Sequence, residues 1–232
     1  VNDIHDLLKP IWKTKTETAS RLLGRIGKVF EYAIVKQMLP PPNPAAWKGN
    51  LSVLLPQKSK VAKVKNQPAL RLEDTQRWWA DLQQRDGIGA FALRFLTMAA
   101  SRSGEIRGMH WDEIELFDAT KVRELGYYGI WTCPAERMKA KREHRVPIIK
   151  EMFEILLALK KEKGLVFPSR NDTPLSDMTL SALMKRMHKA DNVGYIDAKS
   201  KRPAVPHGLR STFRDWVAET GQSRESAELQ LA

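Results

Sequence analysis

A basic segment between Pro56 and Pro68 constrains the fold most, because it separates two parts that must fold on their own. Its lysines alternate with small or polar residues, and they are Lys58, Lys60, Lys63 and Lys65. Such a stretch carries too little apolar surface to join a core, so it predicts an exposed linker. We therefore expect a first domain over residues 1–56, a linker over 57–68 and a second domain over 69–232.

The first part has the pattern of a small all-helical domain. Apolar residues recur at steps of three and four between Leu22 and Ile34, which predicts an amphipathic helix. Thr14 and Glu17 have the spacing of a capping box at the start of that helix. The prolines at 40–42 should end it, and Asn43 before Pro44 predicts the start of a second helix.

The second part is expected to be mostly helical with a small antiparallel sheet. Strand-like alternation appears over 113–117, 127–132 and 144–149, and the polar stretch 134–142 predicts a hairpin tip between the last two. Helical patterns cover 72–82, 89–100, 151–161, 175–189, 207–220 and the residues from 224 onward. The expected fold class is therefore mainly α, of the α+β type.

Composition and charge narrow the partners. The 232 residues carry a net charge of +12, which favours a polyanion such as nucleic acid, because neutralised phosphates release condensed counterions. The single cysteine, Cys133, excludes an internal disulfide and a thiolate-rich zinc site, as suits a reducing cytoplasm. No apolar run is long enough to predict a membrane helix, and we expect no membrane partner.

Three places along the chain carry residues suited to phosphate chemistry. Arg102 follows an apolar helix, and Glu105 lies three residues on, where a carboxylate can orient a guanidinium. Lys139 lies in the hairpin tip. His207 and Arg210 share one face at a helix start, where free N–H groups also attract an anion.

Each of these signals has an ordinary alternative when taken alone. The Arg102 and Glu105 pair suits a solvated helix end. Lysines in hairpin tips are usually solvated, and basic neighbours leave the choice of residue open; they are Arg137, Lys141 and Arg142. A His-x-x-Arg spacing occurs by chance in many helices. Basic stretches far apart in the sequence nevertheless favour a groove lined for a nucleic-acid backbone.

Three ordered motifs with their flanks carry a resemblance to a known family. They are residues 101–106 with 110–114 (SRSGEI, HWDEI), 138–139 with 144–148 (MK, HRVPI), and 207–213 (HGLRSTF). In this order they resemble the tyrosine recombinase, or phage integrase, family. The first part of the chain resembles the core-binding helical domain of integrases from prophages and genomic islands, so the resemblance covers essentially the whole chain.

The resemblance implies a role for each matching residue. Arg102 and Arg210 would clamp the non-bridging oxygens of the scissile phosphate and stabilise its transition state. Lys139 would protonate the departing 5′ oxygen, and His207 would assist proton transfer. Glu105 would orient Arg102 or support the fold around it.

The family's activity is site-specific cleavage and rejoining of DNA through a 3′-phosphotyrosyl intermediate, for integration or excision of a prophage or mobile element. It implies double-stranded DNA at an attachment-site core as partner, four protomers on two duplexes, and a bacterial or phage-encoded protein in the cytoplasm. It implies no metal, no cofactor and no small-molecule substrate. We expect DNA contacts from the basic residues Lys58, Lys60, Lys63, Lys65, Lys141, Arg142 and Arg145.

The tyrosines depart from the family's pattern, in which the nucleophile follows the His-x-x-Arg helix. The four tyrosines are Tyr32, Tyr127, Tyr128 and Tyr195, and all precede His207. This departure suggests a fragment cut off before its nucleophile, able to bind DNA but not to cleave it. The missing initiator Met suggests in addition that the natural N-terminus lies upstream. Two alternatives are a non-catalytic DNA-binding module on this fold and a type IB topoisomerase, and the integrase-like first domain argues against the latter.

Overall fold

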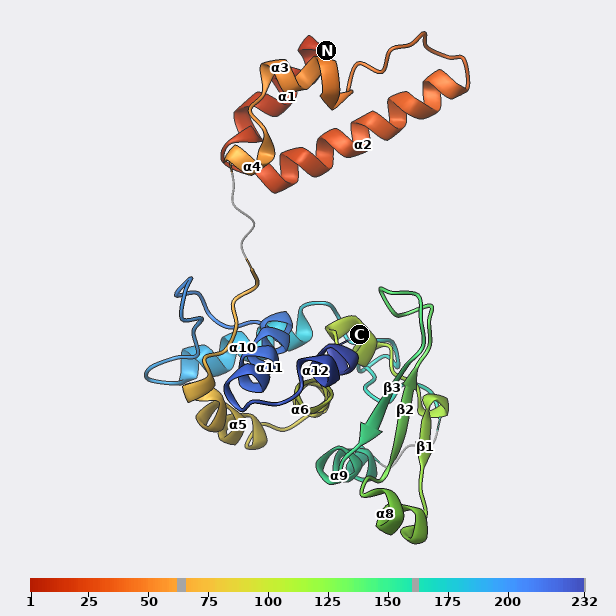
Figure 1. Ribbon diagram of the computed structural model, residues 1–232, viewed down its shortest axis with the longest axis vertical. Helices are drawn as coiled ribbons and strands as arrows, with labels where there is room; N and C mark the ends of the chain where they lie inside the picture. The colour runs from red at the N-terminus through yellow and green to blue at the C-terminus, as the bar shows by residue number, and fades with distance from the viewer. Residues whose placement is uncertain (62–65, 160–162, 232) are drawn as a thin grey trace. The chain divides into compact units, whose positions relative to one another are not determined.

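The chain divides into two compact units, Val1–Lys65 and Asn66–Ala232 (Figure 1). The structure is a computed structural model that describes residues 1–61, 66–159 and 163–231. Lys63 and Lys65 of the predicted linker lie outside the described residues. Within the described part, no helix combines the length and the apolar character needed to cross a membrane.

The regular elements of the first unit are all helical in its described residues. Its elements are α1 (Asn2–Trp12), α2 (Thr16–Val35), a short π-helical turn (Trp47–Leu51), α3 (Ser52–Leu54) and α4 (Lys58–Val61). Apolar residues one turn apart on α1, namely Ile4, Leu8 and Trp12, are buried against Ala19 and Leu23 of α2. Trp12 closes this small core, because its Nε1 donates to the carbonyl of Pro56 at 2.8 Å and its ring stacks on Trp47.

Neither of the two predicted N-caps in this unit caps a helix. The N-cap of α2 is Lys15, without a side-chain cap, and the Thr14 hydroxyl turns back to the carbonyl of Pro10. The reason is that α1 ends directly before, so the hydroxyl of Thr14 finds a free carbonyl there. Asn43 does accept from the N–H of Ala45, but it closes a turn and no helix begins at Pro44.

Part of the segment expected to be a linker is helical. Residues 58–61 form α4, which contacts α2, and Nζ of Lys58 pairs with Glu17 at 2.5 Å. Val61 also packs against the core of the first unit. The first unit therefore reaches further along the chain than the apolar pattern indicates.

The second unit contains eight α-helices in its described residues, three of which are short. They are α5 (Thr75–Gln83), α6 (Ile88–Ala99), α7 (Ser103–Arg107), α8 (Ala119–Leu125), α9 (Lys150–Leu159), α10 (Thr179–Ala190), α11 (Leu209–Glu219) and α12 (Arg224–Leu231). Three 3-10 turns, Leu72–Asp74, Trp111–Glu113 and Pro206–Gly208, precede α5, β1 and α11. Helices α7 and α8 have no counterpart in the sequence pattern, because α7 has only five residues and α8 exposes most of its seven.

One three-stranded antiparallel sheet lies beside these helices, in the order β1 (Ile114–Leu116), β2 (Gly129–Cys133) and β3 (His144–Ile148) (Figure 1). Its register pairs Trp131 of β2 with Ile114 on one side and Val146 on the other. Alternate residues of β2 are buried, as expected for a strand with one face on the core. The expected fold class, mainly helical with a small antiparallel sheet, is confirmed.

Helix α6 forms the centre of this unit's core. It is apolar around most of its circumference, as a helix surrounded by other elements must be. Phe95 of α6 makes edge-to-face contacts with Trp131 of the sheet and with Phe167. Helices α7, α9 and α10 also contact it. Because several elements pack around α6, the residues that follow its C-terminal end have a well-defined position.

The segment after the linker passes directly beneath the start of α11. Val205 N donates to the carbonyl of Pro68, and the Thr212 hydroxyl donates to Leu70 at 2.8 Å. Gly208 makes this approach possible, because a Cβ there would overlap the Pro68 carbonyl and lie 2.9 Å from the Cα of Ala69. Packing thus requires a glycine at position 208, directly after His207.

We predict that Gly208→Ala destabilises the second unit by about 2–3 kcal/mol, since backbone atoms cannot give way as a flexible side chain would. Thermal unfolding followed by calorimetry measures the effect. Gly104→Ala is the matched control, because Gly104 is helical with open space around its Cα, and we expect it to be neutral or slightly stabilising. Equal melting temperatures for the two variants would contradict this packing.

Candidate functional site

Arg102 is placed by the turn that joins α6 to α7. Ala100 ends α6 in the left-handed conformation, with φ of 50°, and Arg102 is the N-cap of α7. Glu105 holds Arg102 twice: its Oε2 accepts from the Arg102 backbone N–H, and its Oε1 accepts from Nη1, both at 2.8 Å. The Glu105 side chain is only 4% exposed. This carboxylate therefore caps the helix and fixes the direction of the Arg102 guanidinium.

Arg210 reaches the same turn from the first turn of α11. Its Nη1 donates to the carbonyl of Ala100 at 2.6 Å, and its Nη2 donates to the carbonyl of Leu231 at the end of α12. Burial, reinforced by the positive charge of Arg102, lowers the pKa of Arg210 to about 10. Two arginines from distant parts of the chain thus lie close together, and both are held by oxygen acceptors.

His207 lies beside the two arginines, in the 3-10 turn Pro206–Gly208. Partial loss of solvent around its imidazole lowers its pKa, and the positive charges of Arg210, Arg102 and Lys139 lower it further. The ring is therefore neutral near pH 7. The structure brings these four residues, separated by up to 108 positions in the sequence (210 − 102), into one electrostatic cluster.

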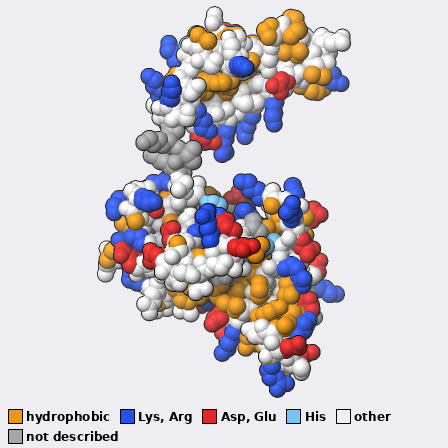
Figure 2. Space-filling view, viewed as in Figure 1, with side chains coloured by type: hydrophobic (Ala, Val, Ile, Leu, Met, Phe, Trp, Pro, Cys, Tyr) orange, Lys and Arg blue, Asp and Glu red, His pale blue; other side chains and the backbone are white. Residues whose placement is uncertain are grey.

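Lys139 comes to this cluster from the hairpin that joins β2 to β3. The lysine is exposed, and it follows the buried Met138. The basic residues Lys141, Arg142 and Arg145 are also exposed on this hairpin and on β3. Figure 2 shows blue Lys and Arg side chains beside pale-blue His on one face of the second unit.

His144, the first residue of β3, is a member of the cluster that the sequence reasoning did not single out. Burial lowers its pKa, and the charges of Arg210 and Arg102 act in the same direction. Glu105 and the backbone of Gln230 act the other way. The available signal was its place in the motif that follows Lys139, directly after a basic hairpin, where a strand end can turn a ring toward a ligand.

Two of the expected basic residues of the linker belong to the described part of the first unit. Lys58 pairs with Glu17 inside the first unit, and Lys60 is exposed. The placement of Lys63 and Lys65 is not described, so their expected DNA contacts stay predictions.

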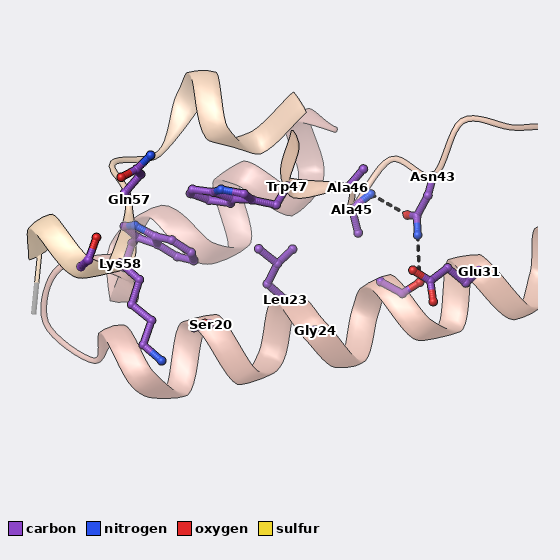
Figure 3. A pocket seen from close by; sticks show the side chains of 13 residues that line it. Ser20, Leu23, Gly24, Glu31, Asn43, Ala45, Ala46, Trp47, Gln57 and Lys58 are labelled. Carbon is purple, nitrogen blue, oxygen red and sulfur yellow. Dashed lines mark hydrogen bonds between the residues drawn. The ribbon is translucent and has the colours of Figure 1, made fainter. Parts of the chain in front are cut away.

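The first unit has a pocket of about 790 Å³ with a different character (Figure 3). The stacked rings of Trp12 and Trp47 line it, together with small residues of α2 such as Ser20 and Gly24. Its lining offers Glu31 and Lys58 but no grouping of titratable side chains suited to catalysis. In the described residues of both units, no three His, Cys, Asp or Glu side chains are grouped to hold a metal ion.

The cluster in the second unit is suited to a phosphodiester. Two guanidiniums can each donate two parallel N–H groups to phosphate oxygens, and an ammonium and two neutral imidazoles offer proton transfer beside them. Glu105 is a carboxylate whose charge acts on both His144 and Arg210. A bound anion would relieve the mutual repulsion of the three cations, so anion binding is the chemistry that the arrangement favours.

Comparison with known proteins gives the cluster a context. The sequence model described as "Phage integrase family" matches residues 81–231, and that of the "Phage integrase central domain" matches residues 1–50. Prophage integrase IntZ of Escherichia coli K12 is 31% identical over 99% of this chain and 52% of its own length. The chain thus spans about half the length of the curated relatives it matches.

Solved structures show the same fold at lower identity. A lambda integrase dimer bound to a COC′ core site has a TM-score of 0.66 and 18% identity, covering 100% of this chain and 77% of that one. A lambda integrase tetramer bound to a Holliday junction also has a TM-score of 0.66, with 17% identity over 99% of this chain and 62% of that one.

The charge around His207 leads to a measurable prediction. Its pKa, followed by NMR of the ring protons, should lie below the ordinary 6.5 in the chain without DNA. Arg210→Gln should raise it, because removing a nearby positive charge favours the imidazolium. Lys121→Gln is the matched control, since Lys121 pairs with Glu115 and does not act on His207. An unchanged pKa of His207 in the Arg210→Gln variant would show that the two groups are not close.

Proposed function

The chain belongs to the phage integrase family, and on that basis we propose that it is the core-binding and catalytic part of a site-specific DNA recombinase. Such a protein cuts and rejoins DNA during integration or excision of a prophage or mobile element. The observation that carries the proposal is the meeting of Arg102, Lys139, His207 and Arg210 around one site. DNA binding alone would not require this set.

Each residue of the cluster has a role in the proposed reaction. The guanidiniums of Arg102 and Arg210 hold the non-bridging oxygens of the scissile phosphate and stabilise the negative charge that grows in the transition state. The oxygen of a tyrosine bonds to phosphorus while the bond from phosphorus to the 5′ oxygen breaks. Lys139 gives a proton to that 5′ oxygen, and the neutral ring of His207 takes up the proton that the tyrosine hydroxyl loses.

We propose different roles for the two units. We assign DNA-core recognition to the helical first unit and strand cleavage to the second. The exposed basic residues of the hairpin and β3, Lys141, Arg142 and Arg145, are suited to the phosphate backbone next to the cluster. The lambda integrase tetramer on a Holliday junction supports an assembly of four protomers on two duplexes.

The residues of this chain by themselves should bind DNA without cleaving it, because the tyrosines of the second unit make other contacts. Tyr195 is 2% exposed and donates its hydroxyl to Asp81, and burial raises the pKa of that hydroxyl. Tyr128 stacks on Phe153 of α9. Tyr127 packs on Phe117, and Tyr32 is an exposed residue of the first unit. Tyr127, Tyr128 and Tyr195 of the second unit are not among the groups whose charges act on His207 and Arg210.

The test compares cleavage with binding in a protein of the relatives' full length that contains these residues. With duplex carrying its core site, a covalent protein–DNA adduct should appear on a denaturing gel. Arg210→Gln should slow adduct formation by about 10²-fold or more while binding changes only a few-fold. Lys121→Gln serves as the control and should match the unmodified protein. Binding that fails in step with cleavage would contradict the role of Arg210.

The 232 residues alone give the complementary result. They should bind the same duplex, with an affinity that falls steeply as salt rises, and form no covalent adduct. A covalent adduct with this chain would overturn the view that its tyrosines are engaged elsewhere. A flat salt response would count against a backbone-binding cluster.

A further inference from the structure

The loop that joins β2 to β3 and carries Lys139 is anchored by an arginine, Arg137. Arg137 donates from Nη1 to Oε1 of Glu113 at 2.6 Å and to the carbonyl of Gly108, and from Nη2 to Oε2 of Glu113. The side chains are 23% and 13% exposed. A bidentate ion pair with such low solvent exposure keeps its geometry far better than an ion pair on the surface.

The partners of Arg137 belong to the elements that build the phosphate cluster. Gly108 directly follows α7, the helix that Arg102 caps. Glu113 closes the 3-10 turn before β1, and it also accepts from Nε1 of Trp131 on β2 at 3.0 Å. Gly108 lies close to the arginine, because a Cβ there would meet Cδ of Arg137 at 3.1 Å. Arg137 thus ties the hairpin to the helix that places Arg102.

Lys139 follows this anchor immediately. Backbone N–H groups of Arg137 and Met138 donate to Pro134 and Ala135, which closes a turn. Met138 is 2% exposed, so the chain is pinned there, and residues 139–143 are all exposed. Lys139 is therefore the first residue beyond the pinned turn, and its backbone position depends on the anchor two residues before it.

Arg137 is itself unsuited to give up a proton. Burial works against its charge, but hydrogen bonds to Glu113 and Cys133 outweigh burial and raise its pKa above the ordinary value. Its Nη atoms already serve the carboxylate and the Gly108 carbonyl. Arg137 is therefore not the group that supplies a proton, and its effect on the reaction must pass through a neighbouring residue.

We propose that the Arg137 and Glu113 pair positions Lys139 to protonate the departing 5′ oxygen. The inference rests on the proposed function, in which the tyrosine oxygen bonds to phosphorus, the bond from phosphorus to O5′ breaks, and the Lys139 ammonium supplies the proton that O5′ takes up. Without the pair, the loop that carries Lys139 is no longer attached to the end of α7. Proton delivery to the 5′ oxygen then slows, while phosphate binding by the arginines continues.

The experiment measures cleavage by a protein of the relatives' full length that contains these residues, on two DNA substrates. One is ordinary duplex, and the other has sulfur in place of the bridging 5′ oxygen at the scissile phosphate. A thiolate leaves without protonation, because thiols are far more acidic than alcohols. Arg137→Gln should slow cleavage of ordinary DNA by about 10²-fold, a typical general-acid contribution, yet cut the sulfur substrate within a few-fold of the unmodified protein.

Further variants make the result specific. Glu113→Gln should show the same rescue by sulfur, and Arg137→Lys, which keeps the charge but loses the two-pronged contact, should be intermediate. The Arg137→Lys variant also tests the proposal if Arg137→Gln does not fold. Arg210→Gln should lose activity on both substrates, because its role is at the phosphate. Glu136→Gln, an exposed neighbour in the same turn, is the matched control and should cut both normally.

The outcomes separate this inference from the function on which it rests. Equal losses on both substrates, or no loss at all, would overturn the positioning role of the pair. An unmodified protein that cuts neither substrate would overturn the proposed function itself. Sulfur rescue in the Arg137 and Glu113 variants, with none in Arg210→Gln, would support both.

Discussion

The structure depends on holding several positive charges close together before any anion arrives. Arg102, Arg210 and Lys139 all act on His207, and their mutual repulsion opposes the fold. Glu105 offsets this repulsion through two hydrogen bonds to Arg102, and the carbonyls of Ala100 and Leu231 accept from Arg210. Oxygen acceptors thus keep the guanidiniums in place in the free protein, so little rearrangement is needed when a phosphate binds.

Packing of the segments next to the cluster residues determines whether the cluster can form. Helix α6 is held by the sheet and by neighbouring helices, and its left-handed end at Ala100 delivers Arg102. The backbone of Pro68 lies against Gly208, which fixes the turn that carries His207. The hairpin with Lys139 is tied back through Arg137. Three separate constraints, one for each segment, therefore converge on one site.

Much of this could be predicted from the sequence, and the exceptions have physical reasons. Apolar periodicity predicted α2, a strongly apolar run predicted α6, and the ordered motifs indicated Arg102, Lys139, His207 and Arg210 as one set. Helix α1 was missed although Ile4, Leu8 and Trp12 have helical spacing, because Pro10 lies inside it. The contact of Arg137 with Glu113 was out of reach, since the two residues are 24 positions apart and only the folded sheet joins them.

The central claim is that Arg102 and Arg210 together hold one phosphodiester. Binding of duplexes in which one phosphate at a time is replaced by a neutral methylphosphonate tests it most directly. At a single position, neutralisation should weaken binding of the unmodified chain by about tenfold or more and have little effect on Arg102→Gln or Arg210→Gln. Equal losses at every position, or the same loss in the variants as in the unmodified chain, would contradict the claim.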